Sequence, residues 1–569
     1  MSELTLTPSE VEPRAGDEAI PRAPIPSTQS SAPERWLRAH LDLVAATITA
    51  AAFGLRIYVA SRNYLNPDEA LHYLIINQAN VWLTYKTSLT NAHPPLIYLV
   101  VYAWRYLGRS ELMLRMPSVL TGTAACWLGF KWVKMVAGEA AALFAVILLA
   151  FSPGMVVLSA ELRAYALLLA CMTAALYFLA RAFEKKSAGD MWIFSVFLYL
   201  AILSHYSALF FTVAAGLYAL ARFADSRLPR NVVAAWAAGQ AGALALYGFL
   251  YVTHVSKLKN SIAVWSTPFG TAYFHSTDSN IFDFTGSNTL NIFLFFFSQR
   301  IVAWTLLLSF FAGVAILFGK DLRASRMSLR SDHLGLLLAL PFVAVWGAAL
   351  VGIYPYVGSR HTAFLAPFAI AGASYLFSVI SRQRLWTALV IAALLMGLSQ
   401  AGDKSMELNT SSGDNSPKMM ADSIRYLQAA NSRGDTILLD YQSSLPFTYY
   451  FCGPKTTIPY RIFAGDYFEF RCNGDPLVAL RIWKAGAAGF PDQFEKMTRS
   501  HSLKPGDRVW IYQTGWGETL DIKLDRQEPR FHCLAPQHFG TGIVIIPFVV
   551  GPDFQPIAAS NACANLNRQ

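Results

Sequence analysis

The stretch LDLVAATITAAAFGLRIYVASRNYLNPDEALHYLIINQA, residues 41–79, decides the architecture of this chain. Residues 41–60 are mostly apolar, and a helix needs about 20 such residues to cross a bilayer. Two adjacent carboxylates, Asp68 and Glu69, follow shortly after this run, at the start of an amphipathic helical pattern. The stretch therefore predicts a membrane-spanning helix that delivers an acidic pair to the membrane surface.

The composition of the whole chain supports a membrane protein with many helices. Of its 569 residues, 54% are hydrophobic and 14% are charged, whereas a soluble protein carries about 25% charged residues. The net charge of +10 fits an excess of Lys and Arg on cytoplasmic loops. The sequence has no basic tract with interleaved aromatic residues, the pattern that would indicate nucleic acid as a partner. The bilayer is therefore the expected environment.

The basic residues orient the predicted helices. If the N-terminus is cytoplasmic and residues 61–116 stay outside, nearly every basic cluster in a connecting loop falls on the cytoplasmic side. The run at 94–108 holds only about 13 apolar-type residues before its Arg and Gly, and is predicted to be interfacial or re-entrant. We therefore predict about eleven transmembrane helices. Their ranges are 41–60, 117–134, 139–153, 162–182, 190–204, 206–222, 232–252, 298–318, 334–353, 361–380 and 385–400.

Three other segments complete the predicted organisation around a membrane domain at 34–400. Residues 1–33 are rich in Pro, Ser, Glu and Ala and are predicted to be a disordered cytoplasmic tail. Residues 61–116 and 254–297 are the two large outer loops. Residues 401–569 are patterned like a globular protein, with an amphipathic helix in KMMADSIRYLQAA and strands in DTILLDY and DRVWIYQTG. This part is predicted to be a soluble extracytoplasmic domain of α/β or α+β type.

The cysteines agree with an outer location for the terminal domain. Cys126 and Cys171 lie within predicted spans and are expected to be packing residues. Cys452, Cys472, Cys533 and Cys563 all lie in the terminal domain, an even number suited to an oxidising compartment. Two disulfides are expected, and the sequence leaves their connectivity open.

Polar side chains from separate segments gather at the outer membrane face in this topology. Ionisable groups at membrane depth are costly and mark functional cavities. Arg can engage two phosphate oxygens at once, and a carboxylate beside an acceptor hydroxyl can act as a general base. The residue types therefore suit a lipid-linked sugar phosphate. The candidates are Asp68, Glu69, His93, Glu161, Arg163, Tyr165, His205, Tyr206, Tyr356, Arg360 and His361.

At these positions the chain resembles the GT-C superfamily of glycosyltransferases that use polyprenyl-phosphate sugars. The resemblance is to the branch of protein O-mannosyltransferases and bacterial lipid A aminoarabinose transferases. The matching pieces are NPDEALHY, HPPLIYLVVYAW, LRMPSVLTG, FSPGMVVLSAELRAYALLLA, LSHYSALFF and GSRHTAFLAP, spread over residues 66–367. Each piece is short, and their order and topological side carry the resemblance.

The resemblance implies a GT-C-type membrane domain and roles for particular residues. Asp68 matches the catalytic Asp of the acidic motif in the first outer loop, and Arg163, Arg360 and His361 are the matching candidates for binding the lipid phosphate. Aminoarabinose transferases often carry a Lys-containing version of the HPP stretch. His93 departs from that pattern, which argues against aminoarabinose as the donor sugar.

Structural roles stand beside these functional ones. Asp68 can be the N-cap of its helix, and Glu69 can favour the helix N-terminus through the helix dipole. Arg163 and Glu161 can pair with nearby charges. Arg360 and His361 can belong to an interfacial belt, and His93 can be a structural hydrogen-bonding group.

The prediction is an inverting membrane glycosyltransferase that moves a sugar from a polyprenyl-phosphate carrier to a lipid, glycan or protein acceptor. We expect it in a bacterial inner membrane, with the terminal domain in the periplasm. No cofactor is expected, and a divalent metal stays open although no His, Cys, Asp and Glu spacing indicates one. The alternative is a transporter or flippase of lipid-linked sugars. The concentration of polar groups on one membrane face argues against it, because a transporter binds its substrate near mid-membrane. A weaker alternative is a wall-binding module on an inert anchor.

Overall fold

The computed structural model describes the chain from residue 31 to residue 550, with internal gaps. The described ranges are 31–225, 228–258, 270–276, 280–326, 332–401, 416–432, 435–457, 467–480, 503–504, 506–514, 531–540 and 542–550. Most of the predicted tail at 1–33 lies outside them, but helix α1 begins inside it, at Ala32.

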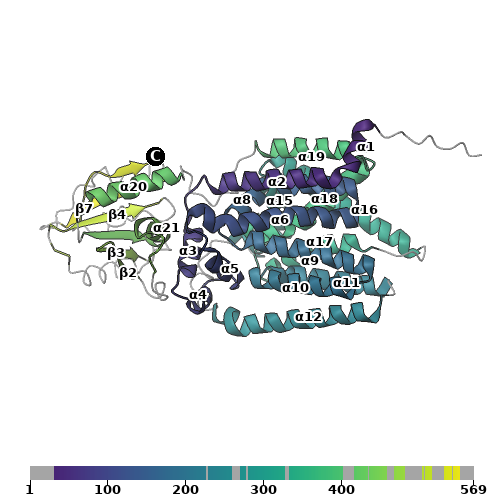
Figure 1. The fold of residues 1–569 in the computed structure, drawn as a ribbon, viewed down its shortest axis with the longest axis horizontal. Helices are drawn as coiled ribbons and strands as arrows, with labels where there is room; N and C mark the ends of the chain where they lie inside the picture. Colours follow the sequence, from purple (N-terminus) through teal and green to yellow (C-terminus); the bar gives the residue numbers. More distant parts are fainter. Residues whose placement is uncertain are drawn as a thin grey trace, which may run out of the picture.

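A bundle of helices forms the larger part of the molecule (Figure 1). Its helices on the N-terminal side are α1 (Ala32–Ala39), α2 (Leu41–Ala60), α3 (Pro67–Ile76), α4 (Val81–Ser88), α5 (Leu96–Trp104), α6 (Glu111–Ala137), α7 (Glu139–Phe151), α8 (Pro153–Ala160) and α9 (Tyr165–Lys185). They are followed by α10 (Ala188–Ser204), α11 (Ala208–Asp225), α12 (Arg230–Leu250), η1 (Tyr251–Val255), α13 (Ser256–Leu258), η2 (Gly270–Ala272), α15 (Ile281–Phe297), α16 (Arg300–Arg326), α17 (Leu334–Leu350), η3 (Arg360–Leu365), α18 (Ala366–Ile380) and α19 (Leu385–Ser399).

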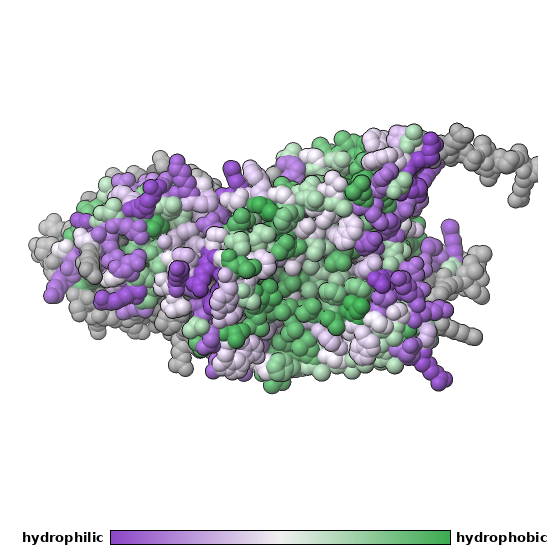
Figure 2. All heavy atoms as spheres, in the orientation of Figure 1, coloured by the Kyte–Doolittle hydropathy of each residue, from purple (hydrophilic) through white to green (hydrophobic). Residues whose placement is uncertain are grey.

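Each predicted span range coincides with a helix of this bundle, but not all of these helices are long and apolar enough to cross a membrane. Six within the described ranges pass that test, or seven if α7 and α8, which are bent by 54° to each other, form one span. The apolar helices α10, α17 and α19 are shorter, at 17, 17 and 15 residues. A broad hydrophobic band crosses the bundle between two hydrophilic ends (Figure 2), as expected for a protein in a bilayer.

Two segments of the outer regions have helical structure of their own. The predicted interfacial run at 94–108 contains α5, whose nine residues are too few to span, since about 17 are needed. The second predicted loop, at 254–297, ends in the 17-residue helix α15. The phenylalanines Phe293, Phe296 and Phe297 of α15 are buried in the main core of the bundle. This part of the second loop is therefore packed into the membrane domain.

The C-terminal domain is built around a seven-stranded mixed sheet. Its elements are α20 (Pro417–Ala430), β1 (Thr436–Asp440), α21 (Tyr441–Phe451), β2 (Tyr467–Cys472), β3 (Asp475–Leu480), β4 (Arg508–Gln513), β5 (Phe531–Cys533), β6 (Gln537–Phe539) and β7 (Ile543–Val550). The strand order is β2-β3-β1-β4-β7-β5, and β6 pairs with β7. Because β1 pairs in parallel with both β3 and β4 while the remaining pairs are antiparallel, the domain is an α/β domain with antiparallel edges.

Helix α21 docks this domain onto one end of the bundle, against α3 (Figure 1). Leu445 and Tyr449 of α21 belong to one buried cluster with residues of α3, α5 and α6. The hydroxyl of Tyr450 accepts a hydrogen bond from the backbone N–H of Leu65 at 2.9 Å, and the Tyr449 hydroxyl donates to the Arg109 carbonyl at 2.8 Å. The domain is therefore packed directly on the helix that follows the first span.

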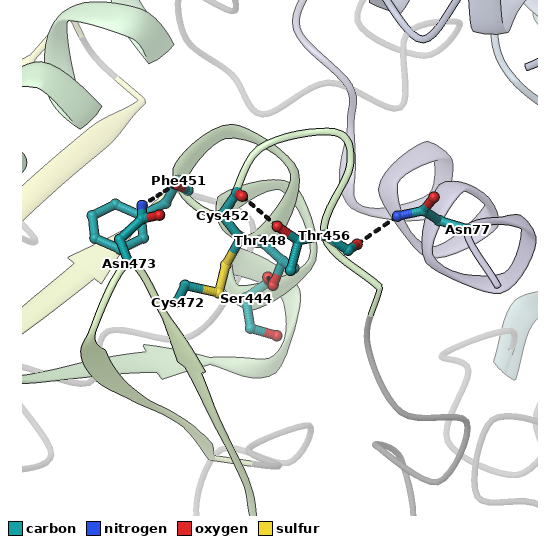
Figure 3. Close-up of a disulfide and its surroundings, with 8 residues drawn as sticks. All are labelled: Asn77, Ser444, Thr448, Phe451, Cys452, Thr456, Cys472 and Asn473. Carbon is teal, nitrogen blue, oxygen red and sulfur yellow. Dashed lines mark hydrogen bonds between the residues drawn. A yellow bond between two sulfur atoms is a disulfide. The ribbon is translucent and has the colours of Figure 1, made fainter. Parts of the chain in front are cut away.

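A disulfide joins the end of α21 to the end of β2, between Cys452 and Cys472 (Figure 3). The segment just after Cys452 reaches α3, where the side-chain amide of Asn77 donates to the Thr456 carbonyl. Of the two expected disulfides this one is present. The side chain of Cys533 and the whole of Cys563 lie outside what the structure describes.

Breaking this disulfide should loosen the docking segment. Replacing Cys452 by Ser is expected to destabilise the terminal domain by about 3 kcal/mol, because the bridge closes a loop of 20 residues and constrains the unfolded chain. Thermal unfolding of the purified protein, with Cys171→Ser as a control within the bundle, measures the loss. Equal melting temperatures for Cys452→Ser and the wild type would contradict the assignment.

Candidate active site

The acidic stretch begins helix α3 with a cap that does not involve Asp68. Asn66 is the N-cap: its side-chain oxygen accepts from the Glu69 backbone N–H at 2.9 Å, and Glu69 Oε2 accepts from the Asn66 backbone N–H at 3.1 Å. These two hydrogen bonds form a reciprocal capping box. Pro67, which follows Asn66 directly, is a residue favoured in the first helical turn. Capping by Asp68, the structural alternative, is therefore not what the structure shows, and the Asp68 carboxylate is left available for other contacts.

Glu69 faces the protein interior and holds Arg115. The two Glu69 oxygens accept from Arg115 Nε at 2.7 Å and Arg115 Nη2 at 2.6 Å, and Oε1 also accepts from the Leu162 backbone N–H at 2.8 Å. Arg115 donates further to the carbonyls of Ala60 and Asn63, both at 2.7 Å. Glu69 is only 1% exposed. These contacts give Glu69 a structural role at the helix start, and its predicted substrate contact stays a prediction.

Asp68 lies between two arginines that come from distant segments. Its Oδ2 atom is 3.1 Å from Arg163 Nη1 and 2.6 Å from Arg360 Nη1. Arg163 lies in the connection between α8 and α9, and Arg360 begins the 3-10 helix η3. The structure thus brings together the predicted base and two of the predicted phosphate-binding residues.

The two guanidinium groups control the charge of Asp68. Burial opposes ionisation of this carboxyl, but the charges of Arg163 and Arg360 outweigh that effect and hold its pKa well below its usual range. Asp68 and Arg360 keep partly exposed side chains, whereas Arg163 is buried. Two cations contact one carboxylate here, so these three side chains carry an excess positive charge while the nearby Glu161 is protonated, and this charge can attract an anion.

Histidine and tyrosine rings form a buried cluster beside this ion pair. His93 lies 5.1 Å from His205 and 5.6 Å from His72, measured between ring centroids. Tyr165 lies 5.1 Å from His205 and 6.4 Å from His361, and Arg163 stacks over the Tyr165 ring at 5.7 Å. The predicted residues His93, Tyr165, His205 and His361 are therefore neighbours.

The histidines of the cluster that lie outside the spans are neutral. Burial lowers the pKa of His72 and of His205 to about 3, and the positive charge of Arg163 acts in the same direction. Burial also lowers the pKa of His93 well below its usual range. Neutral imidazoles both donate and accept hydrogen bonds. Within the described ranges, His93 Nδ1, Tyr165 Oη and Arg163 Nε are buried without a hydrogen-bond partner, so the cluster keeps free capacity for a polar ligand.

Glu161 completes the acidic side of the site. It receives a hydrogen bond from the Asn66 side-chain amide at 3.4 Å. Burial and the nearby Glu69 carboxylate raise the pKa of Glu161 to about 7, against the opposing charges of Arg163 and Arg360. Glu161 is therefore protonated in mildly acidic solution, while Asp68 remains ionised.

Two predicted residues form contacts of another kind. The Tyr206 hydroxyl bonds to His254 Nδ1 at 2.5 Å, and His254 Nε2 lies 2.8 Å from the Asn91 carbonyl, so this pair supports the loop that carries His93. The Tyr356 hydroxyl bonds to Thr289 of α15 at 2.8 Å. Both tyrosines therefore have hydrogen-bond partners within the protein, and their predicted substrate contact stays a prediction.

His72 and Tyr98 belong to the site but were missed by sequence reasoning. His72 Nδ1 donates to the Asp68 carbonyl at 2.7 Å, and the Tyr98 hydroxyl donates to His72 Nε2 at 3.3 Å. The signal was available, because residues four apart share one face of a helix and His72 lies four positions after Asp68. Across the described ranges, no group of three or more His, Cys, Asp and Glu side chains is arranged to hold a metal ion.

Comparison with known proteins agrees with this picture. Residues 92–254 match the family described as dolichyl-phosphate-mannose-protein mannosyltransferase. No curated protein sequence matches the chain. The match supports the resemblance to transferases that use polyprenyl-phosphate sugars, and it covers the segments carrying His93, Glu161, Arg163 and His205.

Solved structures show the same fold. The apo structure of ArnT from Cupriavidus metallidurans has a TM-score of 0.50 at 13% identity, over 91% of this chain and 98% of ArnT. The structure of the same protein bound to undecaprenyl phosphate gives 0.49 at 14% identity, over 90% and 98%. The Archaeoglobus fulgidus oligosaccharyltransferase with a tethered acceptor peptide gives 0.48 at 12% identity, over 86% and 70%. The chain therefore has the fold of ArnT.

The buried pair behind the site should be essential for stability. Replacing Arg115 by Met leaves Glu69 buried without its countercharge, which is expected to cost about 3–5 kcal/mol. Thermal unfolding in detergent measures this loss. Arg425→Met is the matched control, because Arg425 pairs with Asp422 on an exposed helix face, where an ion pair contributes about 0–1 kcal/mol. Equal melting temperatures for the two variants would refute the structural role.

Proposed function

We propose that this GT-C-fold protein transfers a sugar, with inversion, from a polyprenyl-phosphate carrier to an acceptor hydroxyl at the outer membrane face. The observation that carries the proposal is the contact of Asp68 with both Arg163 and Arg360. It supplies a carboxylate base and two phosphate-binding cations within one hydrogen-bonded group. The neutral ring cluster beside it can bind the hydroxyls of a sugar.

The transfer step assigns a task to each of these groups. The acceptor oxygen attacks the anomeric carbon as the bond from that carbon to the phosphate oxygen breaks. The acceptor proton passes to Asp68, and the carrier phosphate leaves with the bonding electrons. Arg163 and Arg360 stabilise the charge that develops on the departing phosphate, which is the largest need of such a reaction.

The charge state of Asp68 connects donor binding to catalysis. While both arginines contact Asp68, its depressed pKa makes it a poor base. A bound phosphate competes for the same guanidinium groups, because Arg can pair with phosphate through two parallel hydrogen bonds. Loss of these contacts raises the pKa of Asp68 and leaves it a better base. The donor would thereby activate the residue that accepts the acceptor's proton.

The proposed orientation follows from the charges at the two ends of the bundle. Helix α3, which contains Asp68, lies at the end covered by the terminal domain, while α1 lies at the opposite end (Figure 1). Basic residues such as Lys134, Lys186 and Arg222 lie in or next to the connections at that opposite end, as expected on a cytoplasmic side. In this proposal the site faces the periplasm of a bacterial inner membrane, and the acceptor reaches it from outside.

Replacing Asp68 by Asn should remove the base but preserve the donor site. We expect kcat to fall between about 100-fold and about 10,000-fold, the contribution of a general base. The donor KM should stay constant or fall, because a competitor for the two arginines is gone. Transfer from a radiolabelled polyprenyl-phosphate sugar by protein in nanodiscs measures both values, with Asp422→Asn, a half-buried carboxylate in the terminal domain, as control. Undiminished kcat would refute the base, and carrier movement across vesicles without transfer would favour a transporter.

Glu161 should make donor binding pH-dependent. Its pKa is raised to about 7, so it is neutral below that pH and negatively charged above it. The charge that appears above pH 7 competes with the donor phosphate for Arg163 and Arg360. The donor KM is therefore expected to rise between pH 6 and pH 8.5. In Glu161→Gln this rise should disappear, and an unchanged pH profile in that variant would contradict the assignment.

A further inference from the structure

Arg56 is a fully buried charge inside the first span that the proposed reaction does not use. It lies in α2, one turn before the helix ends at Ala60, and is 1% exposed. Within the described part of the chain, no carboxylate lies within 4 Å of its guanidinium group. A charge at membrane depth is costly and is retained where it has a task.

The partners of Arg56 are the last carbonyls of helix α7. Arg56 Nη1 donates to the Ala150 carbonyl and Nη2 to the Leu149 carbonyl, both at 3.0 Å. Nη1 also donates to the Ala52 carbonyl of its own helix at 3.2 Å. The last carbonyls of a helix lack intrahelical partners and carry the negative end of its dipole. Arg56 therefore neutralises the C-terminus of α7 at the point where the chain bends by 54° into α8.

Close packing fixes the direction of α8 beyond this bend. The hydroxyl of Ser152, at the bend, donates to the Phe296 carbonyl at the end of α15, at 2.6 Å. A Cβ atom on Gly154 would lie 2.3 Å from the Phe295 carbonyl oxygen, and one on Gly122 of α6 would lie 2.2 Å from Ser159 Oγ. Both positions require glycine, because a Cβ atom would be too close to its neighbour. Helix α8 is thus held by α2, α6 and α15 together.

Helix α8 delivers Arg163 to Asp68. It ends at Ala160, and the next residues are tied to the site scaffold, since the Leu162 N–H donates to Glu69 and the Arg163 carbonyl accepts from Ser118 Oγ at 3.2 Å. The path from Arg56 to Arg163 is one short helix with fixed ends. A change in the bend would move the start of this helix and displace the Arg163 guanidinium group.

We propose that Arg56 is a positioning residue for the donor site, acting through the α7–α8 bend to place Arg163. The inference rests on the proposed function, in which Arg163 binds the donor phosphate. Arg56 itself contacts no reacting group in this assignment. It holds a broken helix in the one direction that brings Arg163 to Asp68, so its loss should weaken donor binding specifically.

A double-mutant cycle between Arg56 and Arg163 tests the proposal. In Arg56→Met the donor KM is expected to rise between about tenfold and about 100-fold, since a displacement of about 1 Å can cost that much. In Arg163→Ala the donor KM should rise as well. The variant with both changes should have the donor KM of Arg163→Ala alone, because residues acting through one contact are not additive. Additive effects would overturn the proposal, since general loosening of the fold does not depend on Arg163.

Two further variants separate positioning from stability. Arg56→Lys keeps the charge with one donor group and should give a smaller rise in donor KM than Arg56→Met. Arg56→Lys also provides the test if Arg56→Met does not fold. A donor KM of Arg56→Lys equal to that of the wild type would overturn the proposal. Arg181→Met is the control, because Arg181 is a partly buried arginine that pairs with Asp190 about 24 Å along α9 from Tyr165. It should lower the melting temperature without changing the donor KM, and a donor KM raised as much as in Arg56→Met would overturn the proposal.

The same kinetics distinguish failure of this inference from failure of the proposed function. If Arg163→Ala raises the donor KM while Arg56→Met leaves it unchanged, the positioning role is wrong and the proposed function stands. If the wild-type protein transfers no sugar, or Arg163→Ala binds the donor normally, the proposed function itself is wrong.

Discussion

The contact of Asp68 with Arg163 and Arg360 is the interaction around which the domain-covered end of the helix bundle is organised. It joins a helix start, a loop between two helices and a short 3-10 helix that are separated by about a hundred residues or more along the chain. One carboxylate cannot neutralise two guanidinium groups, so the cluster retains a positive charge that can attract an anion while Glu161 is protonated. The same two arginines hold the pKa of Asp68 below its usual range. In the proposed function, an anion that competes for these arginines would make Asp68 a better base, which would couple donor binding to proton acceptance.

Such a cluster is useful only if its members cannot drift, and two buried arginines provide this rigidity. Arg115 fixes the start of α3 through Glu69 and through carbonyls at the end of the first span. Arg56 fixes the bend that leads to Arg163. Both are bound by several acceptors in surroundings shielded from water, where an electrostatic contact is stronger than at a surface. The terminal domain adds a third support, because α21 packs on α3 and the segment after Cys452 bonds to its end.

Patterns in the sequence predicted the positions of the helices well. The reason is that the length of an apolar run and the basic residues beside it depend directly on the thickness and the charge asymmetry of the bilayer. They also placed Asp68, Arg163 and Arg360 on one membrane face. They could not decide between capping and catalysis at the acidic pair, since both fit Asp68 and Glu69 locally. The decision came from Arg115, 46 residues after Glu69, and from Asn66, which takes the cap. Arg56 was hidden inside an apolar run, and its role depends on a bend in another helix. Helix α15 occupies the second half of the segment that was predicted as the second outer loop.

The most direct test of this account is a structure of the protein in a lipid nanodisc with a bound polyprenyl phosphate. We expect the phosphate to lie between the guanidinium groups of Arg163 and Arg360, with the Asp68 carboxylate released from at least one of them and turned toward the acceptor side. A carrier bound elsewhere on the bundle, with both contacts of Asp68 unchanged, would contradict it.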